Sequence, residues 1–179
     1  SLQKRNCQQK KKKYLTIKFC VNPMSDQYKK WYSLSHNAKT LINKSIYSIP
    51  AFTKSKIKDY RIVANPGCYP TSIQLALIPL IRKSLIEVNN IVIDSKSGYS
   101  GAGKNYKSKF THKNIENSIF AYGVEKHRHM SELDQQFKKT VKTNIEYTFN
   151  PHLVPTFRGI LSSIYLKTKK NIGIKKIYK

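Results

Sequence analysis

The sequence predicts a mixed α/β or α+β fold. Stretches rich in β-branched and aromatic residues indicate strands near residues 14–21, 62–64, 91–93 and 159–167. A nearly continuous apolar run over residues 73–81 indicates a buried helix, and a polar turn separates it from the preceding strand. The elements follow the order strand, turn, helix, strand, and this order gives an α/β or α+β chain.

The first third of the chain contains two predicted strands. Residues 1–13 are polar and basic and are expected to be solvated, whereas Tyr14–Val21 shows the rough alternation of a strand. Residues 25–45 are polar, with three candidate anchors in Trp31, Tyr32 and Leu34. The run 46–49 followed by Pro50 indicates a turn, and Ile57–Ala64 ends in a short strand.

A helix is predicted after the turn Asn65-Pro66-Gly67. Pro70 suits the first helical turn, where its missing N–H is not needed, and Pro79 is expected to kink or shorten the helix. Beyond the short strand at 91–93, we expect a glycine- and serine-rich loop over residues 95–103. Ser131–Val141 is predicted as a helix with a polar outer face and Gly159–Lys167 as a strand.

Composition restricts the class of protein. The chain has 179 residues, of which 39% are hydrophobic, and this is enough for a packed core. Lys and Arg number 34 against 9 Asp and Glu, so the formal charge is +25, which would attract nucleic acid. The basic residues are nevertheless spread along the chain with many Asn, Ile and Tyr, as an AT-rich coding sequence favours. We therefore prefer compositional bias and expect no specific nucleic-acid partner, with a basic nucleic-acid-binding protein as the alternative.

Three cysteines, Cys7, Cys20 and Cys68, are too few and too unevenly spaced for a disulfide framework or a zinc site. No apolar run approaches the ~18 residues that a membrane span needs. The lysine run at residues 10–13 is not followed by the apolar core of a signal peptide. A cytoplasmic protein without a membrane partner is expected.

Cys68 is the most informative residue. It lies between a tight turn and the predicted helix, where free N–H groups and the helix dipole stabilise an anion. Such a position lowers the pKa of a thiol and favours the reactive thiolate, and the same N–H groups would stabilise an oxyanion. A single cysteine is more often a small buried hydrophobe, but this turn is expected to present the side chain.

A second cluster is His127-Arg128-His129, followed by Glu132. A nucleophilic cysteine needs a proton-transfer partner, and histidine has a suitable pKa. If the stretch is extended, the two histidines point the same way and Arg128 points away. One histidine would then act as acid/base and the other as a binding residue. A His-x-His metal pair lacks an evident third ligand, so no metal site is predicted.

Two further segments are candidates for ligand binding. The stretch from Ser97 to Gly103 is rich in glycine and serine, and its N–H groups would cradle a phosphate or a cofactor. Its glycine order differs from the dinucleotide fingerprint, and a flexible linker is the alternative. In the segment 151–159, two prolines stiffen the chain before Arg158, which offers a planar fork to a carboxylate or phosphate.

These segments, in this order, resemble N-acetyl-gamma-glutamyl-phosphate reductases, which are related to aspartate-semialdehyde dehydrogenases. The resemblance rests on Val63–Thr71 with its cysteine motif, on Asp94–Gly103, on the histidine cluster with Glu132, and on Pro151–Leu161. Weaker family features are the pair Trp31-Tyr32 with His36, and Ile46–Pro50. The similarity extends from about Tyr28 to Lys167.

The resemblance implies a Rossmann-type dinucleotide-binding domain, of which a C-terminal remainder is present, joined to part of a glyceraldehyde-phosphate-dehydrogenase-like catalytic domain. The expected boundaries are residues 1–67, with the basic tail 1–13, for the incomplete dinucleotide-binding domain. Residues 68–179 form the incomplete catalytic and dimerisation domain, and a homo-oligomer is implied for the complete enzyme.

The implied reaction is the NADPH-dependent reduction of N-acetyl-glutamyl 5-phosphate to the semialdehyde, a step of arginine biosynthesis, through a cysteine thioester. Cys68 matches the nucleophile, and His127 is assigned as acid/base with His129 as the rival. The residues implied in substrate binding are His129, Glu132, Arg158 and Ser100, and those in cofactor binding are Ser97 and Gly98.

The sequence departs from the family at both ends, and the C-terminal part of the family's catalytic domain is absent after about Lys167. A glycine-rich loop for the cofactor pyrophosphate would normally follow the first strand, and residues 1–27 contain none. We therefore expect a truncated product, a partial gene model or one piece of a split gene, and we expect this chain by itself to be inactive as a reductase. An inactive remnant is also an alternative function. An aspartate-semialdehyde dehydrogenase is a further rival, against which the Gly67-Cys68-Tyr69-Pro70 context argues.

Overall fold

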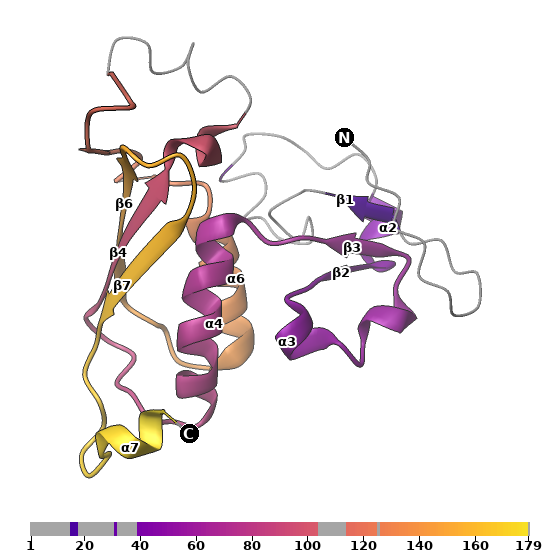
Figure 1. Ribbon diagram of the computed structural model, residues 1–179. Coiled ribbons are helices and arrows are strands. Elements are labelled where there is room, and N and C mark those ends of the chain that lie inside the picture. The colour runs from indigo at the N-terminus through magenta and orange to yellow at the C-terminus, as the bar shows by residue number, and fades with distance from the viewer. Residues whose placement is uncertain (1–14, 18–30, 32–38, 104–113, 125, 179) are drawn as a thin grey trace.

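The computed structural model describes residues 15–17, 31, 39–103, 114–124 and 126–178. Within them, the N-terminal sheet contains strands β1 (Leu15–Ile17), β2 (Ser45–Tyr47) and β3 (Ile62–Ala64), in the order β1-β3-β2. Both neighbouring pairs are parallel, as Figure 1 shows. The predicted strands at 14–21 and 62–64 are confirmed where the structure describes them.

Short helices connect the parallel strands: α2 (Lys39–Ile42), α3 (Pro50–Thr53) and the 3₁₀ helix η1 (Ile57–Asp59). The turn predicted at 46–50 is wrong, because Ile46 and Tyr47 belong to β2 and Pro50 begins α3. Proline is tolerated at this first helical position, since its missing N–H would have no partner there. The parallel pairing of β2 with β3 depends on a distant segment, which the local run of residues does not reveal.

Helix α4 (Cys68–Arg82) is the long helix that follows the Asn65-Pro66-Gly67 turn, as predicted. Its buried face includes Tyr69, Ile73, Leu77 and Ile81, at the helical spacing of three or four residues. Pro79 does not end it, and the helix continues to Arg82. Pro79 removes a hydrogen bond to the carbonyl of Leu75, and Leu75 lies on the exposed side of the helix, 44% accessible to solvent.

The second sheet has the order β5-β6-β4-β7. Its strands are β4 (Ile91–Gly98), β5 (Phe120–Ala121), β6 (Tyr147–Val154) and β7 (Ile160–Tyr165). β4 is parallel to β6, whereas β7 and β5 are antiparallel to their neighbours. Helices α4 and α6 (Met130–Thr140) lie on one face of this sheet (Figure 1), and the short α7 (Ile174–Ile177) follows β7.

The core forms where α4 and α6 meet the second sheet. Ile91 and Ile93 of β4 and Phe149 and Leu153 of β6 alternate inward, as the two-residue period of a strand requires. By contrast, Leu161 and Tyr165 of β7 are 65% and 61% exposed. The predictions of a helix at 131–141 and a strand at 159–167 are confirmed to within two residues at each end.

The loop predicted at 95–103 is wrong in part. β4 continues to Gly98, and Tyr99–Ala102 forms the 3₁₀ helix η2. The N–H groups of Gly98, Tyr99 and Ser100 donate to the carbonyls of Gly159, Thr156 and Phe157 at 2.9 to 3.0 Å. A Cβ at Gly98 would lie 2.8 Å from three backbone atoms of residues 156–158, so only glycine allows this contact. The segment is therefore not a flexible linker, and these three N–H groups are not available to a phosphate.

Several sequence-based expectations lie outside the described residues: the solvated tail 1–13, Cys7, Cys20, Tyr32, Leu34 and His36. Within the described part of the chain, no helix combines the length and the apolar character that crossing a membrane requires.

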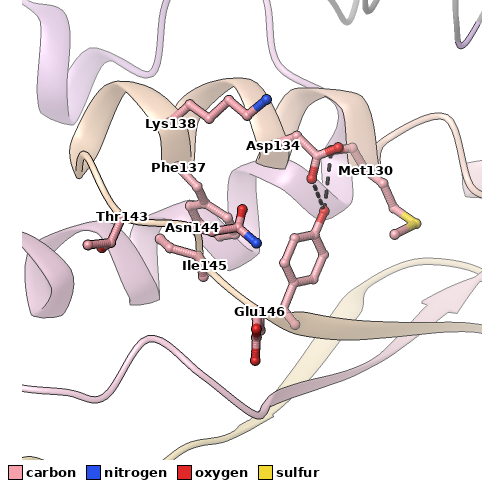
Figure 2. Close-up of a pocket in the computed structure, with 9 residues that line it drawn as sticks. Met130, Asp134, Phe137, Lys138, Thr143, Asn144, Ile145 and Glu146 are labelled. Carbon is pink, nitrogen blue, oxygen red and sulfur yellow. Dashed lines mark hydrogen bonds between the residues drawn. The ribbon is translucent and has the colours of Figure 1, made fainter.

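A hollow of about 440 Å³ opens between α6 and the start of β6 (Figure 2). At the edge of this hollow, the Tyr147 hydroxyl donates a hydrogen bond to Asp134 Oδ1 at 2.7 Å. The backbone carbonyl of Met130 lies 3.4 Å from the same hydroxyl. Burial, followed by the nearby Asp134 carboxylate, raises the pKa of Tyr147. The hydroxyl therefore stays protonated and fastens the first strand residue of β6 to α6.

We expect Tyr147→Phe to lower the free energy of unfolding by about 1–3 kcal/mol, because the hydroxyl donates to a charged carboxylate in a partly buried position. Urea denaturation at neutral pH would measure the loss. Asp134→Asn is the control, because asparagine keeps an acceptor oxygen at that site. We expect this variant to lose less free energy of unfolding than Tyr147→Phe. An unchanged stability for Tyr147→Phe would contradict a stabilising role for this hydrogen bond.

Candidate active site

Cys68 is the first residue of α4, and its side chain is exposed. Gly67, in an extended conformation, is the N-cap, and its carbonyl accepts hydrogen bonds from the N–H and the hydroxyl of Thr71 at 3.0 and 2.7 Å. The thiol therefore lies at a helix N-terminus, where the backbone N–H groups of the first turn favour a thiolate. The predicted position of Cys68 is confirmed.

A cavity of about 400 Å³ lies in front of this thiol. It is lined by residues from four parts of the chain: Cys68, Tyr69, Ser97, Gly101, Ala102, Tyr122, Lys126, His127, Arg128, His129 and Leu153. The helix N-terminus, η2, the histidine turn and β6 therefore meet at one place. Three of the residues proposed from sequence, Cys68, His127 and His129, share this cavity, and Ser97 joins them.

The histidine segment is a turn that leads into α6, and it is not extended. The N–H of Met130 donates to the carbonyl of His127 at 2.9 Å, and both histidine rings point inward with centroids 4.8 Å apart. His127 Nδ1 accepts the N–H of His129 at 3.2 Å, so the neutral ring of His127 carries its proton on Nε2. Arg128 is exposed but still lines the cavity.

Both histidines are electrically neutral at pH 7. Burial is the main cause that lowers the pKa of His127 to about 4, and the positive charge of Arg128 adds to it. Burial also lowers the pKa of His129 to about 3, helped by His127 and Arg128. The two rings are 9% and 8% exposed, so desolvation penalises their charged forms.

Aromatic side chains surround the histidine pair. The ring of Tyr69 packs edge-on against His127 and His129, with centroids 5.7 and 5.9 Å apart, and Tyr122 and Phe149 flank His127. The Tyr122 hydroxyl donates to the Tyr69 hydroxyl at 3.0 Å, and Tyr69 donates to the carbonyl of His152 at 3.1 Å. These rings exclude water from the histidines and fix their orientation.

Gly67 packs closely against His129 and Glu132. A Cβ at this position would lie 2.7 Å from His129 Nε2 and 2.9 Å from Glu132 Oε1, so only glycine permits the approach. The N–H of Gly67 donates to Glu132 Oε2 at 3.0 Å, and the Tyr47 hydroxyl donates to the same oxygen at 2.7 Å. Glu132 is fully buried and does not line the cavity.

The remaining predicted residues lie beside the cavity. Gly98 and Ser100 belong to the paired backbone of residues 97–103 and 156–159, and neither lines the cavity. Arg158 is exposed, and its guanidinium lies 5.1 Å from the centre of the Phe157 ring. Tyr122, Lys126 and Leu153 were not proposed from sequence. Lys126 extends the basic run at 126–129, but nothing local indicates that Tyr122 and Leu153 reach the cysteine.

Comparison with known proteins gives a consistent result. Residues 68–179 match the family described as "Semialdehyde dehydrogenase, dimerisation domain". The chain is 43% identical over 170 residues to the N-acetyl-gamma-glutamyl-phosphate reductase of Clostridium botulinum (strain Eklund 17B / Type B), covering 90% of this chain and 49% of that protein. It is 45% identical over 143 residues to the reductase of the same name from Afipia carboxidovorans, covering 80% and 41%. The chain thus spans about half the length of these curated relatives.

Solved structures with a similar fold include aspartate semialdehyde dehydrogenases. The one from Francisella tularensis superposes with a TM-score of 0.60 at 10% identity, covering 93% of this chain and 54% of that chain. Aspartate semialdehyde dehydrogenase II from Vibrio cholerae, complexed with ASA, gives a TM-score of 0.55 at 15% identity, covering 76% and 48%. At such low identity the likeness concerns the fold alone.

We expect the buried histidine pair to make stability fall as the pH falls below about 6.5. The unfolded chain binds protons on these rings from their ordinary pKa of 6.5 downward, whereas the folded rings stay neutral until about pH 4 and pH 3. Stability is therefore fully present above pH 6.5 and is lost toward pH 4, with a slope approaching about 1.4 kcal/mol per pH unit for each histidine.

Urea denaturation at pH 7, 6 and 5 would measure this slope. The double variant His127→Asn/His129→Asn is the control, because carboxylates that titrate at the lower end contribute equally to both proteins. Equal slopes between pH 6.5 and 5 in the two proteins would contradict neutral burial of the histidines.

Proposed function

Because the chain belongs to the semialdehyde dehydrogenase dimerisation-domain family, we propose that it carries the catalytic part of an N-acetyl-gamma-glutamyl-phosphate reductase. The proposed reaction is the NADPH-dependent reduction of N-acetyl-glutamyl 5-phosphate to the semialdehyde, a step of arginine biosynthesis. The observation that carries the proposal is the shared cavity of the helix-terminal Cys68 and the neutral His127. The names of relatives at 43% and 45% identity support the substrate.

The proposal divides the chain at the turn before Cys68. Residues 1–67 would be the remainder of a dinucleotide-binding domain, which the parallel β1-β3-β2 sheet supports. Residues 68–179 would be the catalytic and dimerisation part, which the family match over the same residues supports. A homo-oligomer belongs to the proposal, and the exposed Leu161 and Tyr165 on β7 are consistent with a surface that a second subunit covers.

Cys68 is the proposed nucleophile. The thiolate, stabilised at the N-terminus of α4, forms a bond from Sγ to the acyl carbon of the acyl phosphate. The bond between that carbon and the phosphate oxygen breaks, and phosphate leaves with the electron pair. The product on the enzyme is a thioester of Cys68. Lys126 and Arg128 line the same cavity and supply positive charge that attracts the anionic substrate.

His127 is the proposed acid/base, with its proton held on Nε2 by the hydrogen bond at Nδ1. The phosphate group of a bound substrate beside the ring would raise the pKa of His127 from about 4 toward 7, because a nearby anion favours the charged form of the ring. The ring then exchanges a proton with the carbonyl oxygen as the tetrahedral thiohemiacetal forms and collapses. When the carbon–sulfur bond breaks, Cys68 leaves as a thiolate and the aldehyde is released. His129, against Gly67, is the proposed binding residue and the rival for the acid/base role.

Small residues form the cavity wall where a nicotinamide would fit. Ser97, Gly101 and Ala102 line this wall, and their short side chains leave room for a planar ring, so the residues present fit that end of the cofactor. NADPH, when bound, would supply the hydride that reduces the thioester carbon. Gly98 would shape the wall through its backbone contact with residues 156–158. Ser100 and Arg158, at the paired turns beside it, remain proposed substrate contacts.

We expect Cys68→Ser in the full-length protein to abolish NADPH oxidation with N-acetyl-glutamyl phosphate, because the serine hydroxyl is not ionised by the same helix N-terminus. The measurement is NADPH absorbance at physiological ionic strength, where nonspecific attraction of polyphosphates to the basic chain is screened. Near-normal turnover by the serine variant would exclude Cys68 as nucleophile. Faster turnover of aspartyl phosphate by the unsubstituted protein would exclude the proposed substrate.

For His127→Asn we expect kcat to fall by about 10²–10⁴ with little change in KM, because proton transfer is lost while the cavity is kept. His129→Asn is the matched control and should act mainly on KM. Steady-state kinetics of both variants would separate the roles. The assignment would be reversed by a large loss of kcat in His129→Asn with normal kcat in His127→Asn.

A further inference from the structure

Glu132 is a fully buried acid in the first turn of α6. Its Oε2 atom accepts the N–H of Gly67 at 3.0 Å, and the bond joins residues 65 positions apart in the sequence. Gly67 immediately precedes Cys68 and caps its helix. A carboxylate oxygen therefore holds the backbone at the residue that positions the thiol.

The same oxygen also accepts a hydrogen bond from the hydroxyl of Tyr47, the last residue of β2, at 2.7 Å. Gln74, one turn and a half into α4 and 1% exposed, donates its Nε2 to this hydroxyl at 2.9 Å. Two bonds, one from β2 and one from the turn before α4, thus converge on one carboxylate of α6, and Gln74 of α4 is linked to it through the Tyr47 hydroxyl. Charge-assisted hydrogen bonds of this kind are strong and directional.

The backbone of Gly67 is fixed on both sides. Its N–H is bound by Glu132, and its carbonyl is bound by the N–H and hydroxyl of Thr71. The orientation of these two groups sets the direction in which α4 begins, and with it the direction of the N–H groups that surround the thiol. Loss of the bond from Glu132 would release only the N-terminal side of this arrangement.

We propose that Glu132 is the positioning residue for Cys68, and that Tyr47 extends this control to the N-terminal sheet. The inference rests on the proposed function of Cys68 as a nucleophile. It assigns Glu132 to the support of the cysteine turn, because its carboxylate is buried among protein donors and away from the cavity lining. Tyr47 then couples the position of β2, in the sheet assigned to the cofactor, to the reactivity of the thiol.

The pair Glu132→Gln and Glu132→Ala tests the hydrogen bond separately from the charge. Both variants remove the negative charge, which by itself would shift the thiol pKa equally in each. Glutamine alone keeps an oxygen that accepts the N–H of Gly67 and the hydroxyl of Tyr47. A difference between the two variants therefore reports the anchoring of Gly67.

The readout is alkylation of Cys68 by iodoacetamide in a Cys7→Ser/Cys20→Ser background of the full-length protein, so that one thiol of this chain reacts. Far-ultraviolet circular dichroism and thermal melting establish that each variant is folded under the assay conditions. At pH 7 we expect the alanine variant to react about tenfold more slowly than the glutamine variant, equivalent to a rise of about one unit in thiol pKa. The rate profile between pH 6 and 9 should shift to higher pH by the same amount. Equal rates and equal profiles would overturn the proposal.

Tyr47→Phe provides the second test and keeps Glu132 itself. It removes one of the two donors to the carboxylate, and in the full-length reductase we expect a fall in kcat of about threefold to tenfold with KM unchanged. A change in KM alone, or no change in either constant, would overturn the role of Tyr47. Alkylation does not depend on turnover. If the proposed reductase activity is not found, the alkylation rates of Glu132→Gln and Glu132→Ala would still test the role of Glu132.

Discussion

The hydrogen bond from the N–H of Gly67 to Glu132 is the contact on which the arrangement of the site depends. It fixes the start of α4, and the packing of His129 against the bare α-carbon of Gly67 places the histidine turn beside the same helix end. A side chain at position 67 would collide with His129 and Glu132 and force at least one of them to move. In the folded chain, the aromatic side chains and the cavity lie beside a backbone segment whose N–H and carbonyl are both hydrogen-bonded.

The electrostatics of the cavity follow from this packing. Tyr69, Tyr122 and Phe149 remove water from His127 and keep the ring neutral, while the side chains of Lys126 and Arg128 are exposed to solvent. The cavity therefore combines a buried proton carrier with an exposed cationic rim. Under the proposed function, an anionic substrate would be attracted by the rim and, once bound, would raise the pKa of the buried ring. The overall charge of +25 adds to the attraction without defining the site.

Much of the fold could be predicted where one segment carries its own signal. The apolar spacing of α4, the amphipathic pattern of α6 and the position of Cys68 after an Asn-Pro-Gly turn were sufficient. Residues 95–98 read as a loop because serine and glycine are poor strand formers, yet β6 and β7 pair with them on both sides and Ser95 is fully buried. The strand β6 was missed because it contains Pro151 and gains its order from β4. Of the site, the thiol and the histidines were predicted, whereas Tyr122, Leu153 and the anchoring contacts of Glu132 depend on pairings between distant segments.

The bonds to Glu132 also impose an order on folding. The carboxylate lies 65 residues beyond Gly67 and 85 beyond Tyr47, so neither contact forms until α6 has docked against α4. Closing such long loops is entropically costly and is typical of late steps in the folding of a domain. The contacts that hold the turn before Cys68 are thus completed only when most of the tertiary structure exists. In a nascent or partly unfolded chain the N–H groups of the first turn of α4 do not yet lie beside Cys68, so the thiol has the reactivity of an ordinary cysteine side chain.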